Sequence, residues 1–372
     1  MNLTEHQGKT LFARHGVPVP RGGLWGDPAL ADLGFPLIAK TQILSGGRGK
    51  RGGVRIVSSP EELAHAAATF MAGTALLPPA LGVIAEEVLE IRREHFLSVV
   101  VDRERRAPLL IAHPDGGVEV ESQMAAGFLR IEIRPSVGIT PEDVRAVTEH
   151  LGFSGDLAVQ LASVIGALWR VFQREDCLLV EINPLVVTAS GRLLAADARV
   201  VVDDAAAPRH PDWPRNVEGT DFEKAVSATG AVGTELDGDV AIVTSGAGLG
   251  MCTMDLVAAT GSRPSCLIDL GGVVFRGAAA LGEALACTAA LRPRVVFVNV
   301  FLQAARCDDL ALGLLAAGDR LRDQRIVMRL RGLRAAEARA LLADRDVFVT
   351  EDLGEALAAA TTEPGRGMEA RA

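Results

Sequence analysis

Short apolar runs, separated by turn residues, dominate the chain from Pro36 to about Val202. Their length and β-branched content predict strands, which read in order PLIAK, GVRIV, GVIAEEV, FLSVVVD, PLLIAH, CLLVEINPLVV and LLAADARVVV. Two longer blocks, Pro60–Met71 and Pro141–Phe172, carry apolar residues at helical spacing instead. Strands joined as antiparallel hairpins, with few helices between them, predict an α+β domain.

Ahead of these strands, the chain opens on one short predicted helix. Thr4 stands three residues before Gln7, the spacing of a capping box, and Leu11 and Phe12 continue an apolar stripe. Gly16 then provides a helix stop signal.

The apolar pattern changes from about residue 238 onward, where strands, glycines and helices follow one another in repeated units. These units are DVAIVTSGAGLGMCTMDLVAATG, CLIDLGG, RVVFVNVF, RIVMRL and DVFVTEDLGEALAAA. Apolar strands that alternate with helices of this length predict an α/β domain with a doubly wound parallel sheet.

A proline-rich segment separates the two patterns. It reads DDAAAPRHPDWPRNVEGTDFEK, with three prolines in seven positions, a composition that packs poorly and favours a surface linker. We therefore predict a first domain over 1–204, a linker over 205–237, a second domain over 238–360 and a frayed tail over 361–372.

Length and composition agree with two folded domains and exclude some partners. The chain has 372 residues, enough for two cores, and 49% of them are apolar. The net charge of −9 disfavours nonspecific binding to nucleic acid or to an anionic membrane. No apolar run approaches the ~18 residues of a membrane span, and the start lacks a signal-peptide pattern, so we expect a cytoplasmic protein.

The cysteines show no metal or redox pattern. Their number is odd, they sit in apolar surroundings and no C-x-x-C pair occurs. We predict buried thiols. The positions are Cys177, Cys252, Cys266, Cys287 and Cys307.

A loop rich in glycine and positive charge is the first candidate site. The stretch Lys40–Val54, KTQILSGGRGKRGGV, holds five glycines and four cations. Glycine lets backbone N–H groups approach a ligand closely, and the cations suit the oxygens of a polyphosphate. No Ser or Thr follows Lys50, so the loop is not a P-loop. Strand-like segments on both sides favour a hairpin lid over a nucleotide, and a mobile cationic hairpin tip is the alternative.

A second hairpin supplies oxygen-bearing side chains. In VEINPLVVTASGRLLAADAR, the predicted turn is 189–191, with Gly191 at the position that favours the left-handed conformation. A register centred on residue 190 places Asn183 opposite Asp197 and Glu181 opposite Arg199. A carboxylate and an amide oxygen form a partial shell suited to Mg²⁺. The spacing leaves a simple cross-strand ion pair between Glu181 and Arg199 as the alternative.

Several motifs in order resemble one family over nearly the whole chain. They are MNLTEHQGKTLFARHGVPVP, SGGRGKRGGV, VVVDRERR, HPDGGVEVE, VEINPLVVTASGRLLAADAR, SGAGLGMCTMDLV and VNVFLQAARCD. The chain resembles the beta subunit of ADP-forming succinyl-CoA synthetase, an ATP-grasp enzyme of the tricarboxylic acid cycle. The resemblance implies an ATP-grasp domain, a flavodoxin-like CoA-ligase domain, ATP or alternatively GTP as nucleotide, and Mg²⁺.

The resemblance also implies roles for individual residues. In the family, a lysine and a glycine-rich loop contact the nucleotide phosphates, carboxylates contact the nucleotide on either side of the adenine-and-ribose segment, and an amide and a carboxylate bind magnesium. The matching residues are Lys40, Gly47, Arg48 and Gly49 for the phosphates, Glu86, Leu89 and Glu94 for the nucleotide, and Asn183 and Asp197 for the metal. Glu181 resembles the acid that steadies a phosphohistidine of the partner subunit.

The implied reaction needs a partner. ATP phosphorylates a histidine on a separate alpha subunit, the phosphoryl group passes to a small carboxylic acid, and CoA displaces it. None of the seven histidines of this chain lies in a sequence setting that suggests the phosphorylated residue. We therefore expect a hetero-oligomer with a CoA-binding alpha subunit.

The carboxyl-terminal half departs from the family pattern. Leu302 and Gln303 replace a glycine pair that opens a helix, Ser245 replaces a substrate-contacting Asn, Val273 replaces a glycine, and Arg331 replaces an acid. The implied substrate positions are Ser245, Gln303, Ala304 and Ala305. These changes favour a divergent acid–CoA ligase. The alternatives are a different phosphoryl acceptor and a catalytically weakened subunit with an assembly or regulatory role.

A dinucleotide-binding function is a weaker alternative. Gly246, Gly248 and Gly250 follow a predicted strand, but their spacing is G-x-G-x-G and not G-x-G-x-x-G. Asp269 falls in an apolar run instead of the ribose-binding position. We interpret Ser245 and these glycines as a helix-start oxyanion site.

Overall fold

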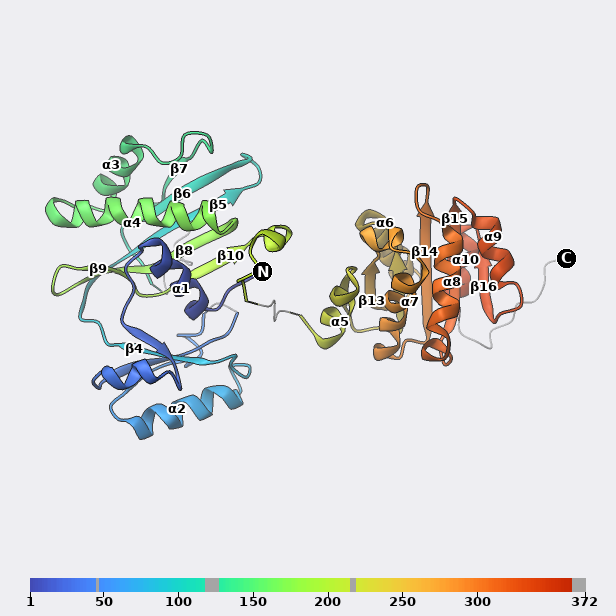
Figure 1. The fold of residues 1–372 in the computed structure, drawn as a ribbon, viewed down its shortest axis with the longest axis horizontal. Coiled ribbons are helices and arrows are strands. Elements are labelled where there is room, and N and C mark those ends of the chain that lie inside the picture. The colour runs from blue at the N-terminus through green and yellow to red at the C-terminus, as the bar shows by residue number, and fades with distance from the viewer. Residues whose placement is uncertain (45–46, 118–126, 215–218, 363–372) are drawn as a thin grey trace. The chain divides into compact units, whose positions relative to one another are not determined.

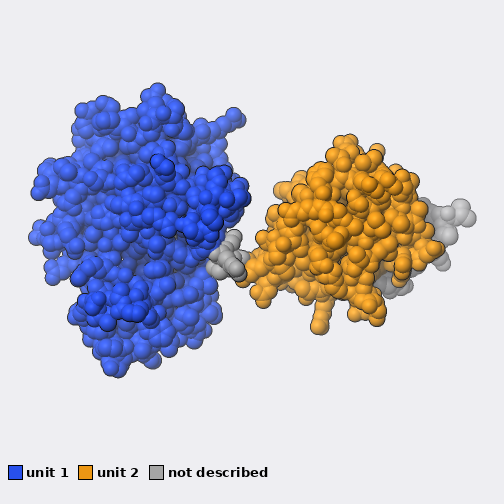
Figure 2. Space-filling view, in the orientation of Figure 1, with its two compact units in different colours: residues 1–218 blue, residues 219–372 orange. Residues whose placement is uncertain are grey.

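The chain divides into two compact units, Met1–Glu218 and Gly219–Ala372 (Figure 2). The computed structural model describes residues 1–44, 47–117, 127–214 and 219–362. Each unit has its own hydrophobic core. The two units are described separately below.

The first unit begins with the predicted capped helix. α1 (Glu5–His15) has Thr4 as its N-cap, and Thr4 and Gln7 form the reciprocal bonds of a capping box. Gly16 ends the helix in the left-handed conformation, with φ 88°. The prediction of this helix is confirmed.

A small antiparallel sheet, covered on one face by a helix, forms one part of the first unit (Figure 1). Its strand order is β1-β4-β2-β3. The elements are β1 (Gly22–Leu24), η1 (Pro28–Asp32), β2 (Leu37–Thr41), β3 (Val54–Val57), α2 (Pro60–Ala72) and β4 (Val83–Glu87). Leu37 and Ala39 pack with Phe70 of α2 in one core, so the alternate residues Ile38 and Lys40 lie on the opposite face of β2. The glycine-rich loop connects the paired strands β2 and β3, as predicted.

A larger antiparallel sheet forms the other part of this unit. Its order is β10-β8-β5-β6-β7, and β9 also pairs with β8. The elements are β5 (Ile91–Asp102), β6 (Ala107–His113), β7 (Leu129–Glu132), α3 (Pro141–His150), α4 (Gly155–Arg174), β8 (Cys177–Thr188), β9 (Leu193–Ala195), β10 (Arg199–Val202) and η3 (Asp204–Arg209). Among the described residues, α4 is the one helix long and apolar enough to cross a membrane. Its apolar stripe, including Leu161, Ile165 and Leu168, is buried in the core of this unit, as in other core helices.

The predicted register of the second hairpin is confirmed. Leu185 pairs with Ala195, and Glu181 pairs with Arg199, as a turn centred on residue 190 requires. Gly191 has φ 78°, the left-handed conformation that the turn needs. The hairpin therefore places Asn183 and Asp197 at matching heights.

The second unit is a doubly wound sheet with the strand order β11-β13-β12-β14-β15-β16. All its pairs are parallel except that of β11 with β13, and the order of the parallel strands is flavodoxin-like. The strands are β11 (Val232–Glu235), β12 (Val240–Thr244), β13 (Pro264–Asp269), β14 (Val295–Leu302), β15 (Arg325–Gly332) and β16 (Val347–Thr350). The chain is therefore α/β in its second half, as predicted.

Helices cover both faces of this sheet (Figure 1). The face toward α6 (Ala247–Ala259) and α10 (Leu353–Thr361) has its own core. The other face packs against α5 (Asp221–Thr229), α7 (Ala278–Ala286), α8 (Cys307–Ala317) and α9 (Ala335–Leu342). The short helical turns are η4 (Gly271–Phe275), η5 (Cys287–Leu291) and η6 (Gly318–Leu321).

The predicted linker, 205–237, contains regular structure that belongs to the second unit. A capping box at Thr220 starts α5, and β11 joins the sheet edge, so residues 219–237 fold with the second unit. The prediction gave too much weight to the prolines, which all precede residue 215. Of the predicted tail, residues 363–372 lie outside the described residues.

The prediction of buried thiols fails at one position. Cys177, Cys266 and Cys307 are buried and Cys287 is half-buried, but Cys252 is exposed on α6. Cys252 lies on the solvent side of this helix, whereas the nearby Thr253 is buried.

A buried histidine makes the stability of the first unit depend on pH. His95, on β5, is 2% exposed and lies edge-on to Phe153, with ring centroids 4.7 Å apart. Burial, together with the nearby Arg93, lowers the pKa of His95 to about 4. The unfolded histidine takes up a proton below about pH 6.5 but the folded one does not, so stability present above that pH is lost as pH falls toward 4.

We expect the free energy of unfolding of the first unit to fall by about 2 kcal/mol more between pH 7 and pH 5 in the wild type than in His95→Phe. Urea denaturation followed by tryptophan fluorescence measures this unit alone, because all three tryptophans, Trp25, Trp169 and Trp213, lie within it. The exposed His65→Phe serves as the control and should keep the wild-type pH dependence. Parallel pH profiles for wild type and His95→Phe would contradict the assignment.

Candidate active site

Lys40 lies at the centre of a buried set of charges. Its Nζ is 2.9 Å from Glu5 Oε1, 2.8 Å from Glu86 Oε2 and 2.8 Å from the carbonyl oxygen of Ala196. The side chain projects from the face of β2 opposite α2, because Leu37 and Ala39 occupy the core side of that strand. The small sheet therefore presents Lys40 toward α1 and the β9–β10 connection.

Two residues that the sequence analysis did not single out complete this set. Glu5 and Lys9 stand one turn apart on α1 and form an ion pair of 2.9 Å. The Nζ of Lys9 also lies 2.5 and 2.8 Å from the two carboxylate oxygens of Glu86, and it donates to Ala196 O at 2.8 Å. Both side chains are buried.

The glycine-rich loop joins the same set through Arg48. Its Nη2 lies 2.6 Å from Glu5 Oε2 and 2.7 Å from Asp197 Oδ2, and its Nη1 donates to Thr41 O at 3.2 Å. Gly47 in this loop has φ 73°, which permits the turn into Arg48. Gly46, one of the predicted loop glycines, lies outside the described residues. We call Glu5, Lys9, Lys40, Arg48, Glu86 and Asp197 the ionic network.

The ionic network favours the charged forms of Glu5, Lys40 and Arg48. Burial opposes ionisation of Glu5, but the attraction of Lys9, Lys40 and Arg48 outweighs it and holds the pKa of Glu5 well below its usual range. Burial likewise opposes the charge on Lys40, yet Glu5 and Glu86 raise the pKa of Lys40 above its ordinary value. The pKa of Arg48 is raised in the same way. Lys40 and Arg48 are therefore protonated.

Of the predicted metal pair, Asn183 lies on β8 and Asp197 lies in the connection between β9 and β10. Val180 and Ile182 point into the core, so Glu181 and Asn183 lie on the opposite face of β8. Asn183 Oδ1 accepts a hydrogen bond from Gly117 N at 2.6 Å, and Asp197 is partly exposed beside Arg48. An amide oxygen and a carboxylate are ligand types that fit a partial Mg²⁺ shell. The described residues hold no group of three or more His, Cys, Asp or Glu suited to a metal.

The structure separates the three predicted nucleotide contacts of the β4–β5 region. Glu86 lies within the ionic network, and Leu89 is half-buried in the connection between the two strands. Glu94 lies near Gly117, since a Cβ on that glycine would come within 2.6 Å of Glu94 Oε2. Gly117 therefore approaches both Glu94 and Asn183.

In the second unit, predicted substrate positions lie at the carboxyl ends of β12 and β14. Ser245 follows β12, and its Oγ is 3.4 Å from Phe301 N. Asp269 Oδ1 accepts hydrogen bonds from Gly246 N at 2.7 Å and Gly271 N at 3.0 Å. Asp269 is thus half-buried and hydrogen-bonded to two loops, and it is not enclosed in an apolar run as expected. The N–H of Gly246, assigned to an oxyanion site, already has a partner.

The segment after β14 also differs from expectation. The strand continues to Leu302, whose side chain is 4% exposed and belongs to the core on the α8 side. Although Leu302 stands in place of a glycine of the family pattern, alternation along β14 turns its side chain into the core. Gln303 and Ala304 are exposed and Ala305 is buried, and α8 starts only at Cys307.

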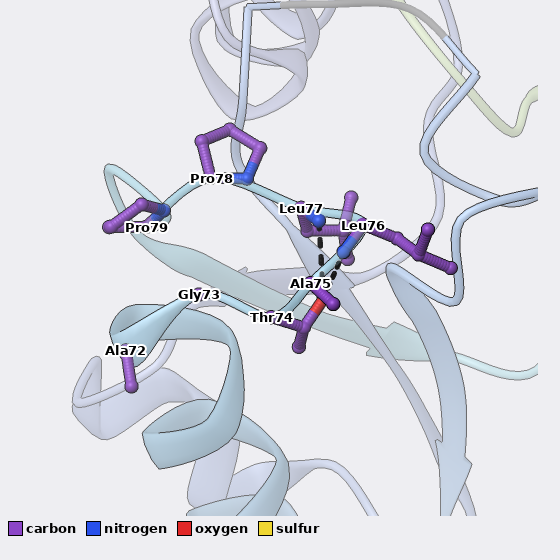
Figure 3. A pocket seen from close by; sticks show the side chains of 8 residues that line it. All are labelled: Ala72, Gly73, Thr74, Ala75, Leu76, Leu77, Pro78 and Pro79. Carbon is purple, nitrogen blue, oxygen red and sulfur yellow. Dashed lines mark hydrogen bonds between the residues drawn. The ribbon is translucent and has the colours of Figure 1, made fainter.

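A separate shallow hollow lies at the end of α2 and involves none of these residues (Figure 3). It is lined by residues 72–79, where Thr74 Oγ1 accepts hydrogen bonds from Leu76 N and Leu77 N. Its lining carries no charged side chain, so it does not suit a phosphate.

Known proteins share both units of this chain. Residues 2–187 match the family model of the ATP-grasp domain, and residues 243–362 match that of CoA-ligase. The subunit beta of ADP-forming succinate–CoA ligase from Rubrobacter xylanophilus is 38% identical over 92% of this chain and 93% of that protein. The subunit beta of GDP-forming succinate–CoA ligase from Thermus thermophilus is 35% identical over 94% of this chain and 95% of that protein.

A solved structure agrees at the level of fold. ATP citrate lyase from Methanothrix soehngenii, in complex with citrate and coenzyme A, matches with a TM-score of 0.75 at 17% identity. The match covers 94% of this chain and 95% of that chain.

An ATP-grasp domain followed by a CoA-ligase domain defines a ligase subunit of the acid–CoA class. The chain belongs to the family of succinate–CoA ligase beta subunits, as relatives 33–38% identical over nearly its full length show.

Proposed function

We propose that the chain binds ATP with Mg²⁺ and drives the formation of an acyl-CoA, with release of ADP and phosphate. The phosphoryl group passes through a phosphohistidine of a CoA-binding alpha subunit to a small carboxylic acid. The observation that carries this proposal is the 2.7 Å contact between Arg48 of the glycine-rich loop and Asp197 of the second hairpin. This contact supports a single phosphate and metal site shared by the two motifs.

Each motif has a role in this proposal. Lys40 and Arg48, with the N–H groups of Gly47 and Gly49, neutralise the charge that develops on the phosphoryl oxygens. Glu86, Leu89 and Glu94 contact the rest of the nucleotide. Asn183 and Asp197 hold Mg²⁺, which would supply further charge neutralisation when bound. Glu181, on the same face of β8 as Asn183, steadies the partner's phosphohistidine.

The names of the relatives support the nucleotide and the partner of this proposal. Both ADP-forming and GDP-forming succinate–CoA ligases are among them, so GTP is the alternative nucleotide. The relatives are named beta subunits, which supports a hetero-oligomer with an alpha subunit. A cytoplasmic role in the tricarboxylic acid cycle agrees with this assignment.

The second unit favours an acid other than succinate. Ser245 and the segment Gln303–Ala305 are the substrate positions of the proposal. Leu302 and Gln303 stand where the resemblance implies a glycine pair that opens a helix, whereas here β14 extends to Leu302 and α8 starts only at Cys307. The same observation favours the second candidate, a subunit with a different phosphoryl acceptor or a weakened, regulatory role.

A labelling experiment tests the proposal. The chain is co-expressed with its CoA-binding partner and incubated with γ-³²P-ATP and Mg²⁺, then with CoA and a panel of carboxylic acids. We expect acid-labile label on a partner histidine, which is discharged only when CoA and one of the acids are both present. ATP binding without label on the partner would favour the second candidate, and tight NAD binding without ATP binding would overturn both.

A further inference from the structure

In the absence of a nucleotide, each cation of the ionic network already contacts a carboxylate of the network. Its three cations, Lys9, Lys40 and Arg48, face its three carboxylates, Glu5, Glu86 and Asp197, at separations of 2.5–2.9 Å. A polyphosphate that binds Lys40 and Arg48 therefore enters a site where those cations already have carboxylate partners. At least one carboxylate must therefore lose its contact with Lys40 or Arg48 when the polyphosphate binds.

Glu5 is the carboxylate that holds both proposed phosphate ligands at once. Its Oε1 lies 2.9 Å from Lys40 Nζ and its Oε2 lies 2.6 Å from Arg48 Nη2. The side chain is 1% exposed, so water does not compete for it.

Lys9 duplicates the contacts of Lys40. Its ammonium lies within 2.9 Å of Glu5, Glu86 and Ala196 O, the three groups that Lys40 also contacts. When Lys40 moves to another anion, Lys9 can keep both carboxylates paired. Without Lys9, Glu86 would lose its cation when Lys40 moves, and Glu5 would lose its last cation once Arg48 also binds phosphate, which is strongly unfavourable.

We propose that Glu5 is an internal counter-ion that occupies Lys40 and Arg48 until nucleotide phosphate displaces it, and that Lys9 is a positioning residue that retains Glu5 and Glu86 during this exchange. This inference rests on the proposed function, because it takes Lys40 and Arg48 as phosphate ligands. The proposal adds α1 to the nucleotide site, which otherwise consists of the glycine-rich loop and the second hairpin.

The test measures binding of ATP–Mg²⁺ and of tripolyphosphate by calorimetry on the full chain with its partner. We expect Glu5→Gln to bind both about tenfold more tightly than the wild type, because a competing charge is removed. We expect Lys9→Met to bind both ligands about tenfold more weakly, because Lys40 is then needed as the lysine partner of Glu5 and Glu86 and is less available to phosphate. Glu175→Gln is the matched control, since it removes a carboxylate that is equally buried but bonded to His15 instead of the network.

The direction of the change separates the proposal from a structural role. If Glu5 only stabilised the fold, its replacement would lower the affinity for both ligands or leave it unchanged. Unchanged or weaker binding by a folded Glu5→Gln variant therefore overturns the proposal. If that variant does not fold, Glu5→Asp takes its place, because its shorter side chain cannot bridge both cations and should also tighten binding. A wild type that binds neither ligand would instead refute the proposed function itself.

Discussion

Lys40→Ala is expected to reduce the affinity for ATP–Mg²⁺ by at least about 100-fold, or about 3 kcal/mol. The substitution removes a buried ammonium whose pKa is raised by Glu5 and Glu86 and which is therefore permanently charged. A phosphate loses a charge-assisted contact in a poorly solvated site, where such contacts are strong. Isothermal titration calorimetry with ATP–Mg²⁺ measures the loss.

Lys224→Ala controls for the loss of a lysine in general, since Lys224 is exposed in the second unit. Circular dichroism and thermal unfolding test whether Lys40→Ala is folded. We expect it to fold, because Lys9 still pairs with Glu5 and Glu86. If a folded Lys40→Ala chain bound ATP–Mg²⁺ with wild-type affinity, the phosphates would not bind in this part of the molecule.

Asp197→Asn is expected to raise the Mg²⁺ concentration needed for half-maximal turnover by about 10- to 100-fold. Asparagine keeps the size of the side chain and one oxygen, but it lacks the charge that Mg²⁺ requires from its ligands. The side chain is 37% exposed, so the substitution should affect folding much less than turnover.

The measurement is a Mg²⁺ titration of ADP formation with the partner subunit present. Asp212→Asn, on an exposed residue paired with Arg14, is the control and should match the wild type. An unaltered Mg²⁺ dependence in Asp197→Asn would show that the metal is held elsewhere.

Local sequence signals were sufficient where one residue determines the geometry. Gly191 sets the turn of the second hairpin, and the turn sets the pairing of Glu181 with Arg199. The two hydrophobic patterns likewise predicted an α+β unit followed by a parallel sheet, because side-chain periodicity follows directly from burial on one or both faces.

The ionic network could be predicted only in part, because its members come from four separate segments. Glu5 and Lys9 were missed although α1 carries a usable signal. Residues 5, 8, 9, 11 and 12 are the buried residues of that helix, and a buried face that includes two charged residues is unusual in a core. A Glu and a Lys four apart on the apolar side indicate buried partners elsewhere in the chain.

Leu302 shows a different limit. Its replacement of a glycine was visible in the sequence, but the direction of its side chain depends on how far β14 extends. Leu302 pairs with Gly332 of β15, which has φ 125°. The N–H of the next residue, Leu333, donates a hydrogen bond to Leu302 O at 2.7 Å. Pairing between distant segments, and not local preference, decides this orientation.

The antiparallel strand β11 has a practical consequence for work on the second unit. It covers the outer edge of β13 with backbone hydrogen bonds, and it lies before residue 238. A fragment that starts at residue 238 would leave that edge open, and an open edge invites pairing with the edges of other molecules and hence aggregation. Expression of the CoA-ligase half should therefore begin near Gly219.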